Sequence, residues 1–267
     1  MIYQMVSHSG AGLFATRMPA GIFSALGGFD LRFTNSDHHV NQMIVGGVTS
    51  GRSLEDYDSY LIGLSDGDSN DPLGSGDPIS AWAKWVNLGA RPTFAASGRS
   101  NGRGRATVRI PELNDDELFV LRGFSIMGAR GRNHHLRQLG VRHLRRSHSI
   151  EVSFADDSAG DDSFSFSVLY TVVQHARLTG TRITPHFFGP FSTTFVFTEQ
   201  TTTPKPVRGF SLLSGFHFEF DDHDHQFRRI TIDPVSHTAF EVWFTDDERD
   251  NRVSASLDYV LMMGYIA

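Results

Sequence analysis

The stretch LGGFDLRFTNSDHHVNQMIV, residues 26–45, occurs in three related forms along the chain. Residues 121–141 read LRGFSIMGARGRNHHLRQLGV, and residues 213–232 read LSGFHFEFDDHDHQFRRITI. Each form begins with Leu-x-Gly-Phe and continues through a polar turn and a histidine into an alternating apolar strand. The aligned histidines are His38, His134 and His225. This recurrence predicts an internal threefold repeat.

The similarity continues downstream, where each copy has an alternating strand, an acidic loop and a second alternating strand. In the second copy this part reads SIEVSFADDSAGDDSFSFSVLYTVV, and in the third it reads AFEVWFTDDERDNRVSASLDYVLM. The first aspartates of the three acidic loops align, and they are Asp66, Asp156 and Asp246. Division after Leu88 and after Ala176 gives three units of nearly equal length, residues 1–88, 89–176 and 177–267.

The residue pattern of each unit is that of β-structure. GRATVRIPE and STTFVFTEQ alternate apolar and polar residues, as half-buried strands do. Clusters of Gly, Asn and Asp interrupt the strands every ~8–12 residues, which is the spacing of a sandwich or barrel. We therefore predict an all-β protein with three antiparallel β-sandwich units in tandem, each with five or six strands and a core of its own. One large β-fold with internal similarity is the alternative.

The composition sets limits on the chemistry. The chain of 267 residues is 39% hydrophobic and contains no cysteine, which excludes disulfides, thiolate zinc sites and cysteine nucleophiles. No apolar run approaches the ~18 residues of a membrane helix, so we expect no membrane span. The N-terminus has no basic segment followed by an apolar one, and a secretory signal is not expected. Synthesis in the cytoplasm, with incorporation into a virion or an extracellular assembly, fits that pattern.

The third unit resembles the H-type lectin domain, an antiparallel sandwich of roughly a hundred residues. The family pattern has a Pro-x-Val strand leading into Leu-Ser-Gly, an Arg-Ile strand, a Thr-Gly-Phe-like strand ending near an aromatic residue and Asp, and a final Ser-x-Ser strand. The matching segments are Pro206-Val207, Leu213-Ser214-Gly215, Arg229-Ile230, Thr238-Ala239-Phe240, Asp246 and Ser254-Ala255-Ser256. The first two units share less of this pattern, since Gln42 and Gln138 stand where Arg229 does.

The resemblance implies a trimeric arrangement that binds sugars of the galactose type through its loops. Three fused units would then form a pseudo-trimer. A carboxylate and an aromatic platform are what sugar recognition requires. The ligand-binding residues that we expect on this basis are Arg229, Asp246, Phe244, Trp243, Asp156 and Asp66. Phe187 is a further aromatic candidate.

The repeated histidines allow two interpretations. Some H-type lectins hold a metal on the trimer axis with one histidine per subunit, and three imidazoles would suit zinc or nickel. A histidine behind Asp or Asn in a turn also fixes the backbone where a strand begins. The expectation that we favour is a turn anchor for His38, His134 and His225, with a metal site as the alternative.

The acidic segment DGDSND, residues 66–71, offers hard oxygen ligands of the kind that calcium prefers. It lacks the glycine of an EF-hand loop at its sixth position, where Asp71 stands. A solvated hairpin turn is the interpretation that we favour for this segment. No cofactor is therefore certain, and a divalent metal, zinc or calcium, stays a hypothesis.

Two further patterns bear on whether the protein is an enzyme and whether it binds nucleic acid. Residues 98–102 read GRSNG and match the nucleophile elbow, which requires a strand before it and a helix after it. A glycine-arginine loop that enters a strand is expected after it instead of a helix. Because no residue set satisfies the geometry of a catalytic site, we predict no enzyme. Arginines are frequent between Arg99 and Arg146, yet the net charge is −6, and nucleic acid is an unlikely partner.

We therefore expect a non-enzymatic protein whose partner is a glycan. The alternative is a structural subunit of a virion, phage tail or surface layer that associates with copies of itself or with other subunits. Repeated strand-rich units with apolar-rich faces and opposite charge clusters suit self-association.

Overall fold

The computed structural model describes residues 3–17, 24–35, 39–46, 59–66, 78–88, 92–100, 102, 104–128, 136–155, 163–174, 179–183, 193–196, 209–220, 227–236, 239–245 and 253–263. In these ranges the regular structure is β, apart from the short 3-10 helix η2 (Arg145–Ser147). The expectation of an all-β protein is confirmed.

Each predicted unit contributes six strands. Those of unit 1 are β1 (Tyr3–Ala11), β2 (Leu13–Arg17), β3 (Ser24–Phe33), β4 (Val40–Val45), β5 (Ser59–Asp66) and β6 (Pro78–Asn87). Those of unit 2 are β7 (Phe94–Arg99), β8 (Arg105–Arg109), β9 (Glu117–Gly128), β10 (Gln138–Leu144), β11 (Ser149–Ala155) and β12 (Phe164–Gln174). Those of unit 3 are β13 (Thr179–Ile183), β14 (Thr193–Val196), β15 (Gly209–Phe220), β16 (Arg229–Ser236), β17 (Ala239–Thr245) and β18 (Val253–Met263).

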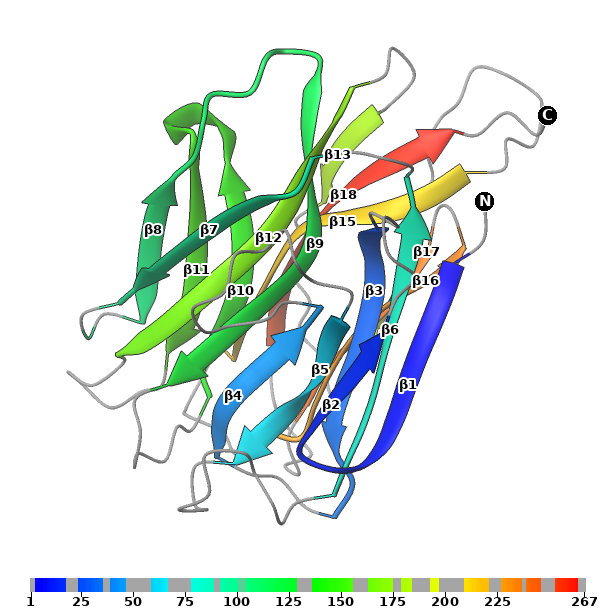
Figure 1. Ribbon diagram of the computed structural model, residues 1–267, viewed down its shortest axis with the longest axis vertical. Coiled ribbons are helices and arrows are strands. Elements are labelled where there is room, and N and C mark those ends of the chain that lie inside the picture. Colours follow the sequence, from blue (N-terminus) through cyan, green and yellow to red (C-terminus); the bar gives the residue numbers. More distant parts are fainter. Residues whose placement is uncertain are drawn as a thin grey trace.

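The eighteen strands form three six-stranded antiparallel sheets, and every sheet takes three strands from each of two units. Sheet A has the order β1-β6-β3-β16-β17-β14, sheet B the order β2-β5-β4-β9-β12-β7, and sheet D the order β13-β18-β15-β10-β11-β8. In each unit the first, sixth and third strands enter one sheet, and the fourth, fifth and second enter another. The three units therefore close in a ring, as a pseudo-trimer within one chain. Figure 1 shows the green strands of unit 2 on the left, the blue strands of unit 1 at the lower right, and β16 and β17 of unit 3 behind β6.

Three strand pairs join the units, and we name them junctions. Junction 1–3 pairs β3 with β16, junction 1–2 pairs β9 with β4, and junction 2–3 pairs β15 with β10. All three have the same register over four residue pairs, and Phe29, Phe124 and Phe216 each stand at the last pair, opposite Ile232, Val45 and Val141. The alignment of Arg229 with Gln42 and Gln138 is confirmed by the same registers.

The Leu-x-Gly-Phe motif creates these junctions. Its second residue is the extra residue of a β-bulge in each unit, between Leu26 and Gly28, between Leu121 and Gly123, and between Leu213 and Gly215. The glycine that follows lies against a backbone carbonyl of the neighbouring unit. A Cβ atom on Gly28 would lie 2.2 Å from the Ile232 oxygen, and one on Gly123 would lie 2.4 Å from the Val45 oxygen. A side chain at these positions would therefore push the units apart.

The phenylalanine of the motif marks the pseudo-threefold axis. The ring centroids of Phe29, Phe124 and Phe216 lie 5.2, 5.3 and 5.5 Å apart in the three pairings, and the rings are tilted by 55–65° to one another. All three side chains are fully buried. Such edge-to-face and tilted contacts add to the free energy gained by burying the rings.

The expectation that each unit has a core of its own is corrected. The main apolar cluster contains buried residues of all three units, because each shared sheet carries apolar side chains continuously from one unit into the next. A second, smaller cluster also draws on all three units. Its buried members are Ala25, Val86, Val120, Val173, Leu212 and Val260.

Replacing Phe124 by alanine should lower the free energy of unfolding by about 3–5 kcal/mol, because the ring is fully buried and contacts both other axial rings. Met5→Ala is the control, since Met5 is 61% exposed, and it should change stability by less than about 0.5 kcal/mol. Urea denaturation followed by circular dichroism measures both effects. A cost below about 1 kcal/mol for Phe124→Ala would contradict an axial packing role.

Candidate functional site

Two of the three tryptophans lie on one outer face of sheet A. Trp82 on β6 and Trp243 on β17 are both partly exposed, whereas Trp85 is buried in the core. The registers place Trp82 opposite Asp30, Asp30 opposite Thr231, and Thr231 opposite Trp243. Directly opposed residues of neighbouring strands point to the same side of a sheet. One row across junction 1–3 therefore carries two indoles with a carboxylate and a hydroxyl between them.

Arg229 connects the members of this row. Its Nε donates a hydrogen bond to Oδ1 of Asp30 at 2.7 Å, and its guanidinium carbon lies 4.6 Å from the centroid of the Trp243 ring. The Thr231 hydroxyl donates to the same Asp30 oxygen at 2.5 Å. The Trp243 Nε1 in turn donates to Glu241 at 2.8 Å. These side chains come from three strands and two units.

Burial gives Asp30 and Arg229 different roles. The Asp30 side chain is 4% exposed and that of Arg229 is 25% exposed. A buried carboxylate requires charged or hydrogen-bonding partners, and Arg229 and Thr231 supply them. Asp30 therefore fixes the guanidinium in position, while the terminal nitrogens of Arg229 carry the remaining N–H donors of that group. Arg229 and the Trp243 ring are the parts of this cluster that reach the surface.

A second pairing of a cation with an indole crosses the same junction. Lys84 on β6 forms an ion pair with Asp233 on β16, and the Lys84 Nζ lies 5.0 Å from the centroid of the Trp82 ring. Both members of the ion pair are about one-fifth exposed, at 21% and 20%. The outer face at junction 1–3 thus presents two indoles, each held by a cation whose charge is matched by an aspartate.

The predicted ligand-binding residues separate in the structure. Arg229 and Trp243 lie in contact, as expected for a shared site. Phe244 is 5% exposed, and its ring stacks against Phe218 and Phe220 at 5.0 and 4.6 Å. Phe244 is therefore a core residue whose ring is covered, and it does not offer a surface for a sugar.

The remaining predicted residues lie at the limits of what the structure describes. Asp66 ends β5, where its backbone pairs with Val40, and its side chain is not among those described. Asp156, Asp246, Phe187 and the three repeated histidines, His38, His134 and His225, lie outside the described residues. Residues 67–77, with most of the acidic segment, lie outside them too. Within the described ranges, no cluster of three or more His, Asp or Glu side chains is arranged to hold a metal ion.

The nucleophile-elbow pattern lies between two strands. Gly98 and Arg99 end β7, and β8 begins at Arg105. Ser100 is buried, and its hydroxyl donates to the carbonyl oxygen of Arg105. Ser100 therefore lies in the connection from β7 of sheet B to β8 of sheet D, whereas the motif needs a helix after the nucleophile.

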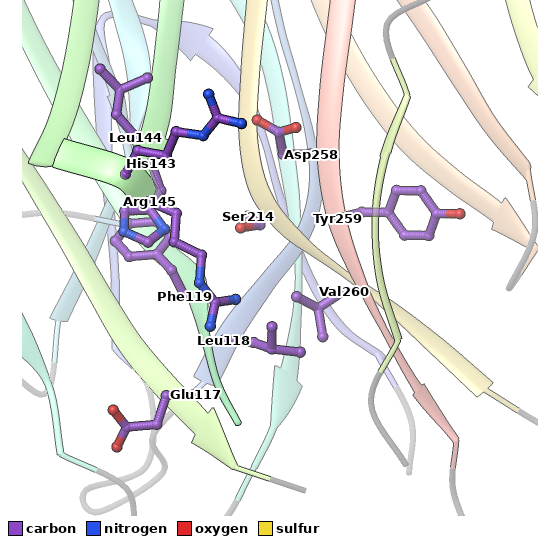
Figure 2. Close-up of a pocket in the computed structure, with 11 residues that line it drawn as sticks. Glu117, Leu118, Phe119, His143, Leu144, Arg145, Ser214, Asp258, Tyr259 and Val260 are labelled. Carbon is purple, nitrogen blue, oxygen red and sulfur yellow. The ribbon is translucent and has the colours of Figure 1, made fainter. Parts of the chain in front are cut away.

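A hollow lies between units 2 and 3, with a volume of about 630 Å³. Figure 2 shows Phe119, His143 and Arg145 on its unit 2 side and Ser214, Asp258 and Val260 on its unit 3 side, with the Tyr259 ring pointing away. Ser214 is the bulge residue of its Leu-x-Gly-Phe motif, so the hollow lies where β15 departs from the junction. Its lining includes acidic, basic and apolar side chains.

His143 is the titratable group most changed by this environment. Burial lowers its pKa to about 4, and the charges of Arg145 and His148 lower it in the same direction. Its ring stacks on Phe119 at 4.9 Å, Phe119 stacks on Tyr170 at 4.8 Å, and Tyr170 stacks on Phe94 at 5.3 Å. His143 is therefore a neutral ring at the end of an aromatic stack at neutral pH. It lines the hollow as an uncharged side chain.

Sequence reasoning missed Asp30 and this hollow. Asp30 directly follows the repeated Gly-Phe, and its equivalents in the other units are Ser125 and His217. The sequence offered one signal for Asp30, which is a carboxylate at a position where the other two copies have none. No sequence signal marks the hollow, because its lining includes residues of β9, β10, β15 and β18, which only tertiary packing brings together.

The contribution of His143 to stability should depend on pH. The unfolded chain binds a proton near the ordinary histidine pKa of about 6.5, whereas folded His143 binds one only near 4, so stability falls as the pH drops between these values. Allowing for the partial exposure of His143, the loss should be about 1–2 kcal/mol. His143→Phe keeps the stack and removes the proton site, so the variant should lose less stability than the native protein between about pH 7 and pH 4.5.

Urea denaturation of both proteins at the two pH values measures this difference. A comparison at about pH 8, where histidine is neutral in both states, isolates the packing effect of the substitution. An identical pH dependence for the two proteins would contradict the assignment of a neutral, buried His143.

No protein-family model matches the sequence, and no curated protein matches it significantly. Within the described residues, no helix has the length and the apolar character that are needed to cross a membrane.

Proposed function

We propose that the protein is a non-enzymatic carbohydrate-binding protein, and that a sugar binds on the outer face of junction 1–3. The observation that carries this proposal is the convergence of Arg229, Asp30 and Trp243, which come from two units and three strands. Such a constellation has a directed hydrogen-bond donor beside an apolar ring.

The chemistry of a sugar fits this surface. A pyranose has a ring of hydroxyl groups and one or more apolar C–H faces, so it needs hydrogen-bond donors next to an aromatic surface. Arg229 offers N–H donors held in a fixed orientation by Asp30, and Trp243 offers the indole. A fixed orientation lowers the entropy lost on binding.

The charge balance favours a neutral sugar. Asp30 matches the charge of Arg229, and Asp233 matches that of Lys84, so the centre of the face carries little net charge. The resemblance of unit 3 to the H-type lectin domain implies a galactose-type sugar, and its Arg-Ile segment contains Arg229. The resemblance and the surface chemistry both support a sugar as the ligand.

Self-assembly as a structural subunit is less well supported. All three junctions are formed within one chain, so the strands that join units are already paired. In the part of the chain that the structure describes, the exposed large apolar side chains are Met5, Phe94 and Val235, which lie on three different strands. Scattered apolar side chains of this kind are ordinary for a monomer surface and do not form a large adhesive patch.

Substitution of Trp243 by alanine should weaken sugar binding about tenfold or more, because the apolar platform is lost. Phe94→Ala is the matched control, since Phe94 is a 36% exposed aromatic residue on β7, at an edge of sheet B. A glycan array identifies the ligand, and calorimetric titration then gives the affinities of the native protein and of both variants. Retained binding in the Trp243 variant, or absence of binding in the native protein, would contradict the proposal.

A further inference from the structure

The three junctions form an internal comparison, because the same registers set the same positions side by side. Arg229 on β16 corresponds to Gln42 on β4 and to Gln138 on β10. Asp30 corresponds to Ser125 and His217 by the same pairings. The backbone pairing is therefore the same at the three junctions, and they differ in the side chains that they carry.

Junction 1–2 lacks the side chains that form the site at junction 1–3. The residues at the positions of Arg229, Asp30 and Trp243 are Gln42, Ser125 and Gly63, and all three are buried. There is no cation and no aromatic ring among these three residues. A ligand at this position would meet neither a charged donor nor an apolar platform.

Junction 2–3 differs in another way. The residues at the corresponding positions are Gln138, His217 and Ser153. The Gln138 amide donates to Glu219 at 2.6 Å and accepts hydrogen bonds from Arg105 at 3.1 and 3.2 Å, so both ends of this amide are engaged within the protein. Ser153 is 1% exposed, and it offers no ring where Trp243 stands in junction 1–3.

His217 does not replace Asp30 as an anchor. Burial lowers its pKa, while the nearby Glu219 opposes that shift. Its Nε2 lies 3.6 Å from a Glu219 oxygen, and its side chain is 14% exposed. A neutral imidazole has a single acceptor nitrogen and no negative charge, whereas the Asp30 carboxylate accepts hydrogen bonds from both Arg229 and Thr231.

We infer that, of the three junctions that the structure describes, only junction 1–3 holds a sugar site, despite the threefold architecture. This inference rests on the proposed function and specifies its valency. The chain is then a recognition module that engages one sugar residue at a time and does not cross-link glycans by itself. Asp30 is the positioning residue of this single site.

Stoichiometry tests the inference directly. The full chain is titrated calorimetrically with a panel of methyl glycosides of galactose, N-acetylgalactosamine, mannose, fucose and N-acetylglucosamine. We expect one bound sugar per chain for the glycosides that bind. Two or three sugars per chain would overturn the single site while leaving carbohydrate binding intact, whereas no binding to any glycoside would overturn the proposed function itself.

Two variants locate the site, and each introduces a residue that the protein already uses at the same position. Arg229→Gln copies Gln42 and Gln138, and Trp243→Ser copies Ser153. Either variant should reduce binding at least tenfold with unchanged circular dichroism, whereas Gln138→Ala, the matched control, should keep one sugar at native affinity. Because Trp243→Ser leaves the Arg229–Asp30 pair in place, it tests the site even where Arg229→Gln fails to fold. Native affinity in a folded variant of either kind would overturn the placement.

Discussion

The close approach of neighbouring units at the glycine of Leu-x-Gly-Phe is the constraint on which the rest of the structure depends. Because Gly28, Gly123 and Gly215 carry no side chain, a strand of the next unit can lie against their backbone. The next residue in each copy then points to the axis, where Phe29, Phe124 and Phe216 meet. The shared sheets and the junctions all follow from this contact.

The sequence was sufficient to predict the repeat, the strand content and the equivalence of Arg229 with Gln42 and Gln138. These features are local, since alternation and the spacing of a motif are read along one segment. It was not sufficient to predict that the units share sheets, because strand pairing between units depends on which edges meet in space. The continuous core was missed for the same reason.

The site was predicted in part. Trp243 and Phe244 are adjacent on one strand, so only one of them can face the surface, and alternation alone does not say which. The structure assigns Trp243 to the outer face and Phe244 to the core. Asp30 acquires its role from Arg229, which lies 199 positions away in the sequence, and no local pattern connects the two.

Fusion of the units allows the junctions to differ, which identical subunits of a symmetric trimer cannot do. One pair of equivalent positions shows this clearly. It is occupied by Lys84 and Asp233 in junction 1–3, by Asp258 and Arg142 in junction 2–3, and by Leu169 and Gly46 in junction 1–2. The charges are exchanged in the second case and replaced by an apolar residue and a glycine in the third.

The strand order of sheet A has a consequence for how the newly synthesised chain folds. Its strands β1, β6 and β3 are synthesised first, and their partners β16, β17 and β14 are synthesised last. Until the C-terminal third emerges, the edge of β3 that pairs with β16 has no partner, and such an edge is prone to pair with other chains. Closure of the ring therefore requires a pairing between β3 and β16, which are far apart in the sequence, and the entropy of closing so large a loop opposes it.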